Sequence, residues 1–288
     1  KLSLTKWNVS LRDSYFFIQF VMFDSFFEKQ ENFTEDRMGR SKMSYEWKCR
    51  VRYSETGVDG KLTLPALVNY FQDCSTFHSE SLGLGWKYLS SKNKAWMLSS
   101  WQIEVNRYPS MGEHITVKTW PHTFKGFLGG RNFLLLDEKE EVLAYANTNW
   151  IFVDVNTGHP TKIDQEELEK YKLENPYDME YAPRKIPFPE GGAQMPEFQI
   201  NSRHLDTNHH VNNEEYIAMA QEYLPDNFCI CSMRAEYKKA ALLHDIVIPI
   251  VKQETGCCEV ALCDEAYKPY AVVVFQGISM TDSLKSSK

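Results

Sequence analysis

The stretch TLPALVNYFQDCSTFHSESLGLG, residues 63–85, has the pattern of one long helix. Thr63 is a suitable N-cap, Pro65 is accepted in a first helical turn, and Gly83 favours an end to the helix. The apolar residues recur at the spacing that places them on one helical face. Four residues make up this face: Leu64, Leu67, Val68 and Phe71. The stretch is therefore predicted to form an amphipathic helix.

Strand-like runs surround this helix. WKCRVRY, residues 47–53, precedes it and alternates between apolar and polar residues, as a half-buried strand does. Four further runs follow it, at 95–106, 114–120, 130–137 and 142–154. One strand, one long helix and then an antiparallel series of strands is the order of a hotdog unit, in which a sheet wraps around a central helix.

The same order of elements returns in the second half. A strand is predicted at 196–204 and a helix at 212–224, which Pro225 closes. Asn212 followed by Glu215 has the spacing of a capping box. Four more strands are predicted, at 231–242, 245–254, 257–265 and 270–278. The repeat predicts an α+β fold with two hotdog units in tandem, each a long helix wrapped by an antiparallel sheet.

The pattern divides the chain into five parts. The two hotdog units are expected at 44–163 and 197–279, and a linker at 164–196 that contains a charged helix candidate and five of the chain's twelve prolines. The apolar run within 1–43 is too short to span a bilayer, so this part is expected to be peripheral. Residues 280–288 are expected to be a tail.

Composition excludes some functional classes. A net charge of -7 argues against a general nucleic-acid binder, which normally has a basic surface. The seven cysteines are an odd number and form no pair of CxxC motifs. Reduced thiols in a bacterial cytoplasm are the preferred interpretation, and a zinc site is the alternative.

The second half contains a polar turn, RHLDTNHHVNNEEY, at 203–216. Asp206, Asn208 and His210 alternate along it, just before the predicted helix. The N-terminus of a helix favours a carbonyl oxygen that gains negative charge. A carboxylate there can act as a base or attack directly, an amide can position it, and a histidine can transfer a proton. The turn therefore suits hydrolysis of an activated acyl ester.

Two other interpretations of this turn remain open. Asp206 and Asn208 could form an Asx turn with a purely structural role. His204, Asp206, His209 and His210 could instead be metal ligands, although they lack the usual spacing of such sites.

The first half has a turn at the corresponding place. Glu55-Thr56-Gly57 stands before its helix as Asp206-Thr207-Asn208 stands before the second one. This first turn contains no histidine, so only the second is expected to be catalytic. The first half, with its long apolar helix and aromatic strands, is expected to hold an acyl chain. Three residues are candidates for contact with that chain: Val68, Trp96 and Trp101.

Three stretches resemble the fatty acyl-ACP thioesterases, the plant plastid enzymes and their bacterial relatives. VKTWPHTFKGFLGGRNFLLLD at 117–137 matches the TWP and Arg-x-Phe pattern of the family. ANTNWIFVDVNTGHPTKI at 146–163 matches its Trp strand, aspartate and proline turn. DTNHHVNNEEY at 206–216 matches its D-x-N-x-H-V-N-N signature. The resemblance covers most of the chain after the first forty residues.

The resemblance implies a double hotdog that hydrolyses the thioester between a fatty acid and acyl carrier protein. It assigns Asp206, Asn208 and His210 as the catalytic residues, without a metal or an organic cofactor. Family members often continue the E-Y-basic-basic motif with Glu-Cys, whereas this chain has Ala240-Ala241 after Lys239. A cysteine nucleophile at that position is therefore excluded, and a helper carboxylate from that strand is absent.

Other functions of a hotdog protein remain as alternatives. They are a 3-hydroxyacyl dehydratase, an acyl-CoA thioesterase, and a binder of acyl-ACP without catalytic activity. The expected partner is acyl carrier protein bearing a phosphopantetheine-linked fatty acid, with no nucleic acid, no membrane and a possible homodimer. Because carrier proteins are acidic, a local basic patch is expected to dock them. Its candidates are Arg203, Lys238 and Lys239, with Arg184 and Lys185.

Overall fold

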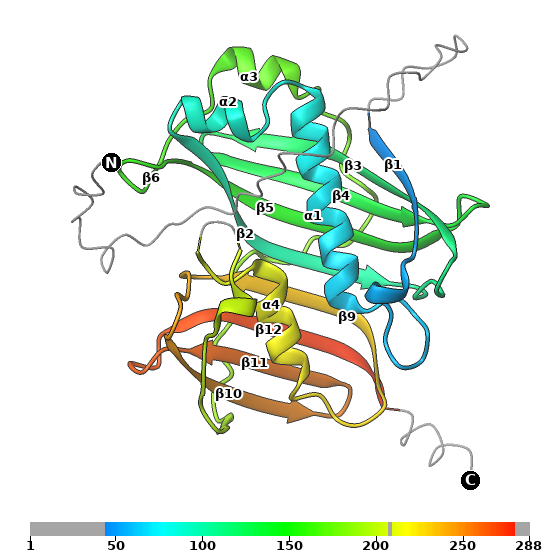
Figure 1. Cartoon of the computed structure of the whole chain (residues 1–288), viewed down its shortest axis with the longest axis vertical. Helices are drawn as coiled ribbons and strands as arrows, with labels where there is room; N and C mark the ends of the chain where they lie inside the picture. The colour runs from blue at the N-terminus through cyan, green and yellow to red at the C-terminus, as the bar shows by residue number, and fades with distance from the viewer. Residues whose placement is uncertain (1–43, 207–208, 280–288) are drawn as a thin grey trace, which may run out of the picture.

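The structure is a computed structural model that describes residues 44–206 and 209–279. It has two units, each with a helix lying on the concave face of an antiparallel sheet (Figure 1). This confirms the predicted tandem hotdog. The predicted peripheral segment and tail lie outside the described residues, as does Asn208 of the polar turn.

The first unit contains the longer helix. Its elements in chain order are β1 (Tyr45–Arg50), η1 (Tyr53–Glu55), α1 (Leu64–Ser81), α2 (Trp86–Ser91), β2 (Lys94–Val105), β3 (His114–Lys125), β4 (Leu128–Leu136), β5 (Val142–Asp154), β6 (His159–Pro160) and α3 (Gln165–Lys170). The hydroxyl oxygen of Thr63 accepts a hydrogen bond from the amide of Ala66 at 3.3 Å, which confirms Thr63 as the N-cap of α1.

The second unit repeats the plan with a shorter helix. Its elements are β7 (Ala193–Gln194), β8 (Phe198–Gln199), η2 (Ser202–His204), α4 (Asn213–Gln221), β9 (Phe228–Tyr237), β10 (Ile246–Glu254), β11 (Cys257–Cys263) and β12 (Pro269–Ser279). Among these described helices and those of the first unit, none has the length and apolar character needed to cross a bilayer.

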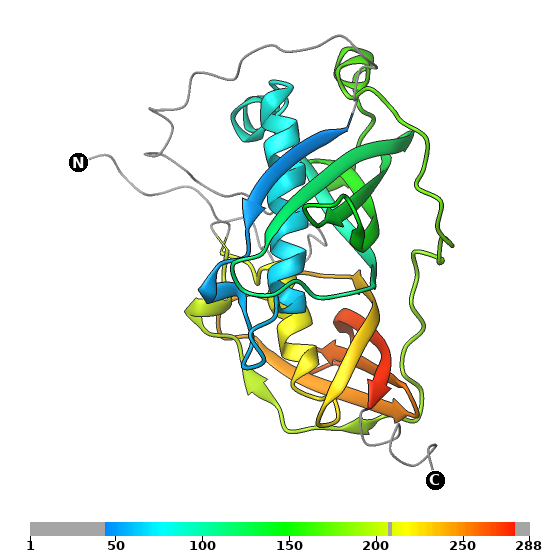
Figure 2. The ribbon, with the colours of Figure 1, turned by 90° about the vertical axis from the view of Figure 1, so that its right-hand side faces the viewer.

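One sheet runs through both units in the order β1-β3-β4-β5-β2-β9-β12-β11-β10-β7. The units join where β2 pairs with β9, from Ser100 opposite Glu236 to Glu104 opposite Ser232. The helices α1 and α4 lie one above the other along the middle of the molecule (Figure 2). A single apolar core includes Phe71 of α1 and Ile217 of α4, so the two units are packed together.

Several predicted element boundaries were wrong. The predicted strand at 196–204 is the short β8 followed by η2, because the side chains of Asn201 and His204 cap a 3-10 turn. The helix α2, of 6 residues, was not predicted from the sequence. The helix predicted at 212–224 ends at Gln221, and the side chain of Asn212 makes no capping hydrogen bond, so there is no capping box.

The two turns correspond, but in a different register from the one predicted. Each follows a 3-10 turn and is closed by a bridge, Thr56 to Leu62 in the first unit and Leu205 to Val211 in the second. The residue after each bridge is the N-cap of the long helix. This pairing places Gly57, not Glu55, at the position of Asp206, because the bridged residues fix the two loops relative to their helices.

Candidate active site

The second turn is a closed loop. The amide of Asp206 donates to the carbonyl of His210 at 2.7 Å, and the amide of His209 donates to the carbonyl of Asp206 at 3.1 Å. A carboxylate oxygen of Asp206 also accepts a hydrogen bond from the amide of His210, at 3.2 Å. These bonds bring Asp206 and His210 together just before α4, as the sequence predicted for two members of the proposed triad.

The segment after β9 holds the turn in place. His210 forms a bridge with Leu242, and the amide of Val211 donates to the carbonyl of Ala241 at 3.1 Å. The amide of Ala241 donates in turn to the hydroxyl of Tyr216 on α4, at 2.8 Å. Burial raises the pKa of Tyr216, so its hydroxyl keeps its proton at neutral pH. Turn, strand end and helix therefore form one hydrogen-bonded unit.

The surroundings of the other two histidines of the turn region, His204 and His209, indicate structural roles. His204 is buried, its Nδ1 accepts a hydrogen bond from the amide of Asn201 at 3.2 Å, and burial lowers its pKa. His209 is exposed and adopts a positive φ of 62°. Within the described residues, no group of three or more His, Cys, Asp or Glu side chains could hold a metal ion.

A cavity of about 190 Å³ reaches the start of α4. Asn212, the residue before α4, lines it, and its other lining residues belong to the first unit. They come from α1, α2, β2, β3, β4, β5 and the segment after α3. The cavity therefore extends from the end of the polar turn into the first hotdog.

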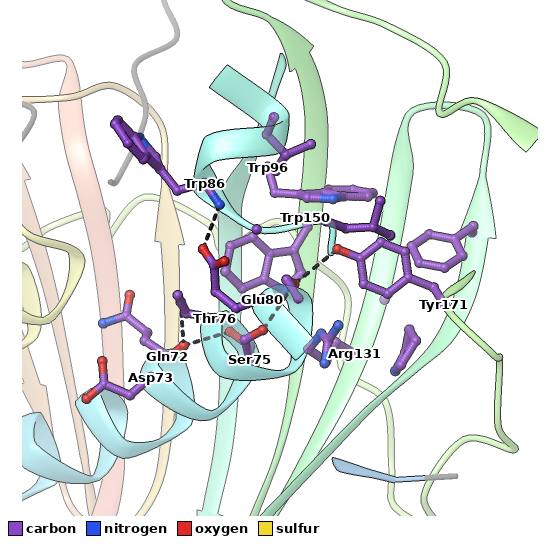
Figure 3. Close-up of a pocket in the computed structure, with 18 of the residues that line it drawn as sticks. Gln72, Asp73, Ser75, Thr76, Glu80, Trp86, Trp96, Arg131, Trp150 and Tyr171 are labelled. Carbon is purple, nitrogen blue, oxygen red and sulfur yellow. Dashed lines mark hydrogen bonds between the residues drawn. The ribbon is translucent and has the colours of Figure 1, made fainter. Parts of the chain in front are cut away.

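A polar stripe along α1 forms one wall of this cavity (Figure 3). Its members follow helical spacing: Asn69, Gln72, Asp73, Thr76 and Glu80. The Oε1 atom of Gln72 accepts a hydrogen bond from Nδ2 of Asn213 in α4 at 3.3 Å. At the other end, the carboxylate of Glu80 accepts a hydrogen bond from the amide of Trp86 at 2.8 Å. The stripe thus links α4 to α2.

Aromatic side chains form the opposite wall. The ring of Trp96 lies 4.8 Å from that of Phe152 and 5.8 Å from that of Phe124, centre to centre. Gly129 permits this packing, because a Cβ atom there would lie 3.0 Å from the indole of Trp96. Trp150 and Tyr171 complete the wall.

A buried arginine lies on the same cavity. The Nη1 atom of Arg131 is 3.0 Å from Nδ1 of His78 and donates to the hydroxyl of Thr119 at 3.1 Å. Burial, followed by the charge of Arg131, lowers the pKa of His78 to about 3, so His78 is neutral and its Nδ1 accepts. The guanidinium also lies over the ring of Tyr171, at 5.9 Å. This end of the cavity is thus positively charged.

The two family models for acyl-ACP thioesterases match most of this chain. The model of the N-terminal domain matches residues 42–171, and that of the C-terminal domain matches residues 190–261. The chain belongs to the acyl-ACP thioesterase family.

Relatives in the family include two chloroplastic plant proteins. An acyl-ACP hydrolase of Cuphea viscosissima is 28% identical over 216 residues, which are 68% of this chain and 52% of that protein. An oleoyl-ACP thioesterase of Arabidopsis thaliana is 25% identical over 241 residues, 76% of this chain and 65% of that protein. The chain spans about half to two thirds of the length of these relatives.

Two solved structures share the fold. An acyl-ACP thioesterase from Bacteroides thetaiotaomicron aligns with a TM-score of 0.76 and 20% identity, over 83% of this chain and 99% of that one. The 12:0-ACP thioesterase from Umbellularia californica aligns with a TM-score of 0.72 and 21% identity, over 83% and 98%. Their similarity supports the double-hotdog arrangement.

The position where family members often have Glu-Cys lies beside the turn. Ala241 is fully buried and its carbonyl accepts the hydrogen bond from Val211. Ala240 is partly exposed next to it. Methyl groups cannot take a proton or attack a carbonyl, so this strand end supplies backbone support to the turn and no reactive side chain.

The three residues predicted to contact an acyl chain lie in different places. Trp96 lines the cavity. Val68 and Trp101 are 0% and 1% exposed within the main core, and they are not part of the cavity lining. Packing in the core accounts for both, and their role in substrate binding stays a prediction without support from the cavity.

The lysines predicted to dock the carrier form ion pairs. Lys238 contacts Glu236 at 2.8 Å, and Lys239 contacts Asp264 at 2.5 Å. Lys239 also lies 4.6 Å from the centre of the Tyr270 ring. Arg203 is exposed in η2, one residue before His204. Part of the positive charge at Lys238 and Lys239 is therefore balanced within the chain.

Two features of the cavity, the polar stripe of α1 and the buried Arg131, were not predicted from the sequence. The stripe had a signal, because Asn69, Gln72 and Asp73 have helical spacing within a helix expected to be wrapped by a sheet. Arg131 stood within a quoted family motif, but nothing in the order of residues showed that it would be buried beside a cavity.

Proposed function

We propose that this protein hydrolyses the thioester of fatty acyl-ACP, releasing a free fatty acid and ending chain elongation. The observation that carries the proposal is a cavity whose lining includes Asn212, two residues after His210 in the chain. Asp206 and His210 are held together by the turn, and Asn212, directly after it, lines the cavity. An acyl chain in the cavity would bring its carbonyl carbon toward the start of α4.

The turn offers the groups that this reaction needs. The carboxylate of Asp206 acts as a base toward water or attacks the thioester itself, and His210 transfers or orients a proton. The amide N–H groups at the start of α4 favour the oxygen that gains negative charge. Asn208, which lies outside the described residues, is assigned from the family signature to position the carboxylate or the water.

The acyl chain is assigned to the first hotdog. Trp96, Phe124 and Trp150 give the cavity an apolar wall, which suits a hydrocarbon chain. The volume of about 190 Å³ is below the roughly 300–1,000 Å³ of typical ligand pockets. A short or medium chain therefore fits this shape better than a long one.

The thiol leaving group is assigned to the phosphopantetheine arm of acyl carrier protein. Docking of this acidic partner on Arg203, Lys238 and Lys239 stays part of the proposal. The ion pairs of the two lysines argue for a modest electrostatic contribution from each. Net charge of -7 makes a local positive surface necessary for rapid encounter with an acidic protein.

The bacterial cytoplasm is the proposed location. All seven cysteines are free in the structure, which is compatible with a reducing compartment. Fractionation of the source cells with an antibody against the protein would test this assignment, and recovery from a membrane or secreted fraction would contradict it.

One observation favours a second function. Ala240 and Ala241 remove two side chains that relatives often have beside the turn, so a protein that binds acyl-ACP without cleaving it is the main rival. Incubation of the purified chain with acyl-ACPs of different chain lengths separates the two functions. We expect release of free thiol, greatest for short or medium chains. Stable binding of acyl-ACP with no thiol release would establish the rival.

A further inference from the structure

The carboxylate of Asp73 has an unusual environment for a charged group. It lies on the polar stripe of α1, next to Gln72 and one turn beyond Asn69. Asp73 is only partly exposed. Among the described residues, no side chain or backbone amide forms a hydrogen bond or an ion pair with its carboxylate. A carboxylate in such a place normally has a partner or a function.

Burial, more than the neighbouring charges, moves the pKa of Asp73 toward neutral pH. Burial raises the pKa of Asp73 to about 6, against a lowering by Arg52 and a further rise from Glu55. Arg52 is engaged elsewhere, because its guanidinium forms an ion pair with Glu55. Glu214 at the start of α4 also faces this region, and burial raises its pKa too. Asp73 can therefore exchange a proton at working pH.

The position of Asp73 connects it to the second unit. Its neighbour Gln72 bonds to Asn213, and Asn69 forms a hydrogen bond with the side chain of Glu214. Asp73 shares the cavity with Asn212, the residue that joins the reactive turn to α4. Figure 3 shows Asp73 and Gln72 projecting together from α1, at the end of the view away from Tyr171.

We propose that Asp73 is a second catalytic carboxylate, which takes the proton from the water that attacks the thioester, so that both hotdogs contribute to one active site. The proposal rests on the proposed thioesterase function. It supplies a carboxylate to a site whose strand end has Ala240 where relatives often have Glu.

The proton balance of this step is complete. The carboxylate of Asp73 removes one proton from water as the water oxygen bonds to the carbonyl carbon. The tetrahedral intermediate then collapses, the carbon–sulfur bond breaks, and protonated Asp73 returns its proton to the sulfur. The products are one fatty acid and one thiol, and Asp73 is again a carboxylate. With Asp73 as the base toward the water, Asp206 keeps the role of orienting His210, whose amide donates to its carboxylate.

The test compares Asp73→Asn with Asp226→Asn, which makes the same change on an exposed loop of the second unit. Thiol release from acyl-ACP is measured between pH 5 and pH 9. We expect Asp73→Asn to lower kcat on the order of 10²-fold with little change in KM. In the wild type and in Asp226→Asn, activity should rise with pH around 6, and this rise should be lost in Asp73→Asn.

Asp73→Glu shows whether a loss of activity in Asp73→Asn comes from the missing carboxylate or from misfolding, since it keeps a carboxylate at the same place. We expect it to retain more activity than Asp73→Asn and to keep an acid limb at a shifted pH. A folded Asp73→Asn with wild-type kcat and an unchanged acid limb would overturn the role of Asp73 and leave the thioesterase proposal intact. A wild-type chain that releases no thiol from any acyl-ACP would overturn both.

Discussion

The two turns of this protein share backbone hydrogen bonds at their described residues and differ in their side chains. In the first, the amide of Gly57 donates to the carbonyl of Lys61 at 2.9 Å, as the amide of Asp206 donates to that of His210 in the second. The amide of Gly60 donates to the carbonyl of Gly57, as the amide of His209 donates to the carbonyl of Asp206. Both loops therefore have the same structural role, because each leads the chain from a 3-10 turn into a long helix.

The difference shows which features serve folding and which serve chemistry. The first loop has Gly57, Gly60 and Lys61 where the second has Asp206, His209 and His210. The first loop also contains a carboxylate, because Asp59 accepts a hydrogen bond from the amide of Lys61 as Asp206 does from that of His210, but it contains no histidine. The histidines of the second loop are therefore not needed to form it.

Asp206→Asn is expected to have the largest effect and sharpens the comparison most. The variant keeps the size of the side chain and its ability to accept the hydrogen bond from His210, but it removes the charge. We expect kcat on acyl-ACP to fall on the order of 10²–10⁴-fold, as for loss of a positioned proton-transfer group. Circular dichroism should show unchanged folding.

The matched control is Asp59→Asn in the first turn, where Asp59 accepts a hydrogen bond from the amide of Lys61. Activity should stay within a factor of two of the wild type, on the order of the small effects of surface changes. Equal losses in both variants would mean that the two turns do not differ in function as proposed.

The two long helices give a second comparison. Asp73 of α1 and Glu222 of α4 stand at the same distance from their N-caps, but α4 ends at Gln221 and leaves Glu222 exposed. Because its pKa is raised from 3.8 to about 6, ionised Asp73 destabilises the folded chain. This cost is absent well below pH 4 and grows until about pH 6, above which it is constant.

Asp73→Asn is therefore expected to stabilise the protein at pH 7, by at most about 3 kcal/mol. The gain over the wild type should shrink as the pH falls from 6 toward 4. Denaturant unfolding at several pH values measures it, and Glu222→Gln is the control that should change little. A loss of stability in Asp73→Asn at pH 7 would show that the carboxylate is a structural partner.

The sequence predicted the architecture well, for physical reasons that are visible in particular elements. The apolar face of α1, its cap at Thr63 and the alternation along the strands are local signals that tertiary packing did not override. The strand predicted at 196–204 failed because Asn201 and His204 cap a turn there, and short-range side-chain bonds compete with strand formation.

The candidate site was predicted only in part. Asp206 and His210 were found because a family signature keeps them close in sequence. Asp73 and Arg131 are distant from that signature, and their importance arises from burial next to a cavity, which depends on how β4 and α1 pack. Val68 and Trp101 were chosen as apolar and aromatic residues, and no pattern in the sequence separates core residues from residues of the cavity wall.

Gly129→Ala is expected to have a moderate effect and tests whether the first hotdog holds the acyl chain. A Cβ atom at this position would lie 3.0 Å from the ring of Trp96 and 3.1 Å from that of Phe124. The rings must move, and the cavity should become narrower. Preference should shift toward shorter acyl chains, with roughly a tenfold change in the ratio of kcat/KM between chain lengths.

Gly192→Ala in the second unit is a control, because a Cβ atom there would meet Ile250 at 3.0 Å, in a region that does not line the cavity. It is expected to change stability without changing chain-length preference. Identical profiles for both variants and the wild type would remove the acyl chain from the cavity.

His209→Gly is expected to have the smallest effect. It tests whether position 209 serves the backbone conformation of the turn or the chemistry of its side chain. His209 has a φ of 62° where Gly60 of the first turn has 72°. Histidine tolerates this left-handed region better than most residues, but glycine adopts it without a steric penalty. Relief of that strain and the greater freedom of glycine in the unfolded chain oppose each other. The free energy of unfolding should therefore change by less than about 1 kcal/mol.

If the chemistry belongs to Asp206 and His210, kcat on acyl-ACP should stay within a factor of three in this variant. A fall as large as that of Asp206→Asn would place His209 among the reacting groups, and the first turn would then differ from the second at one more functional position.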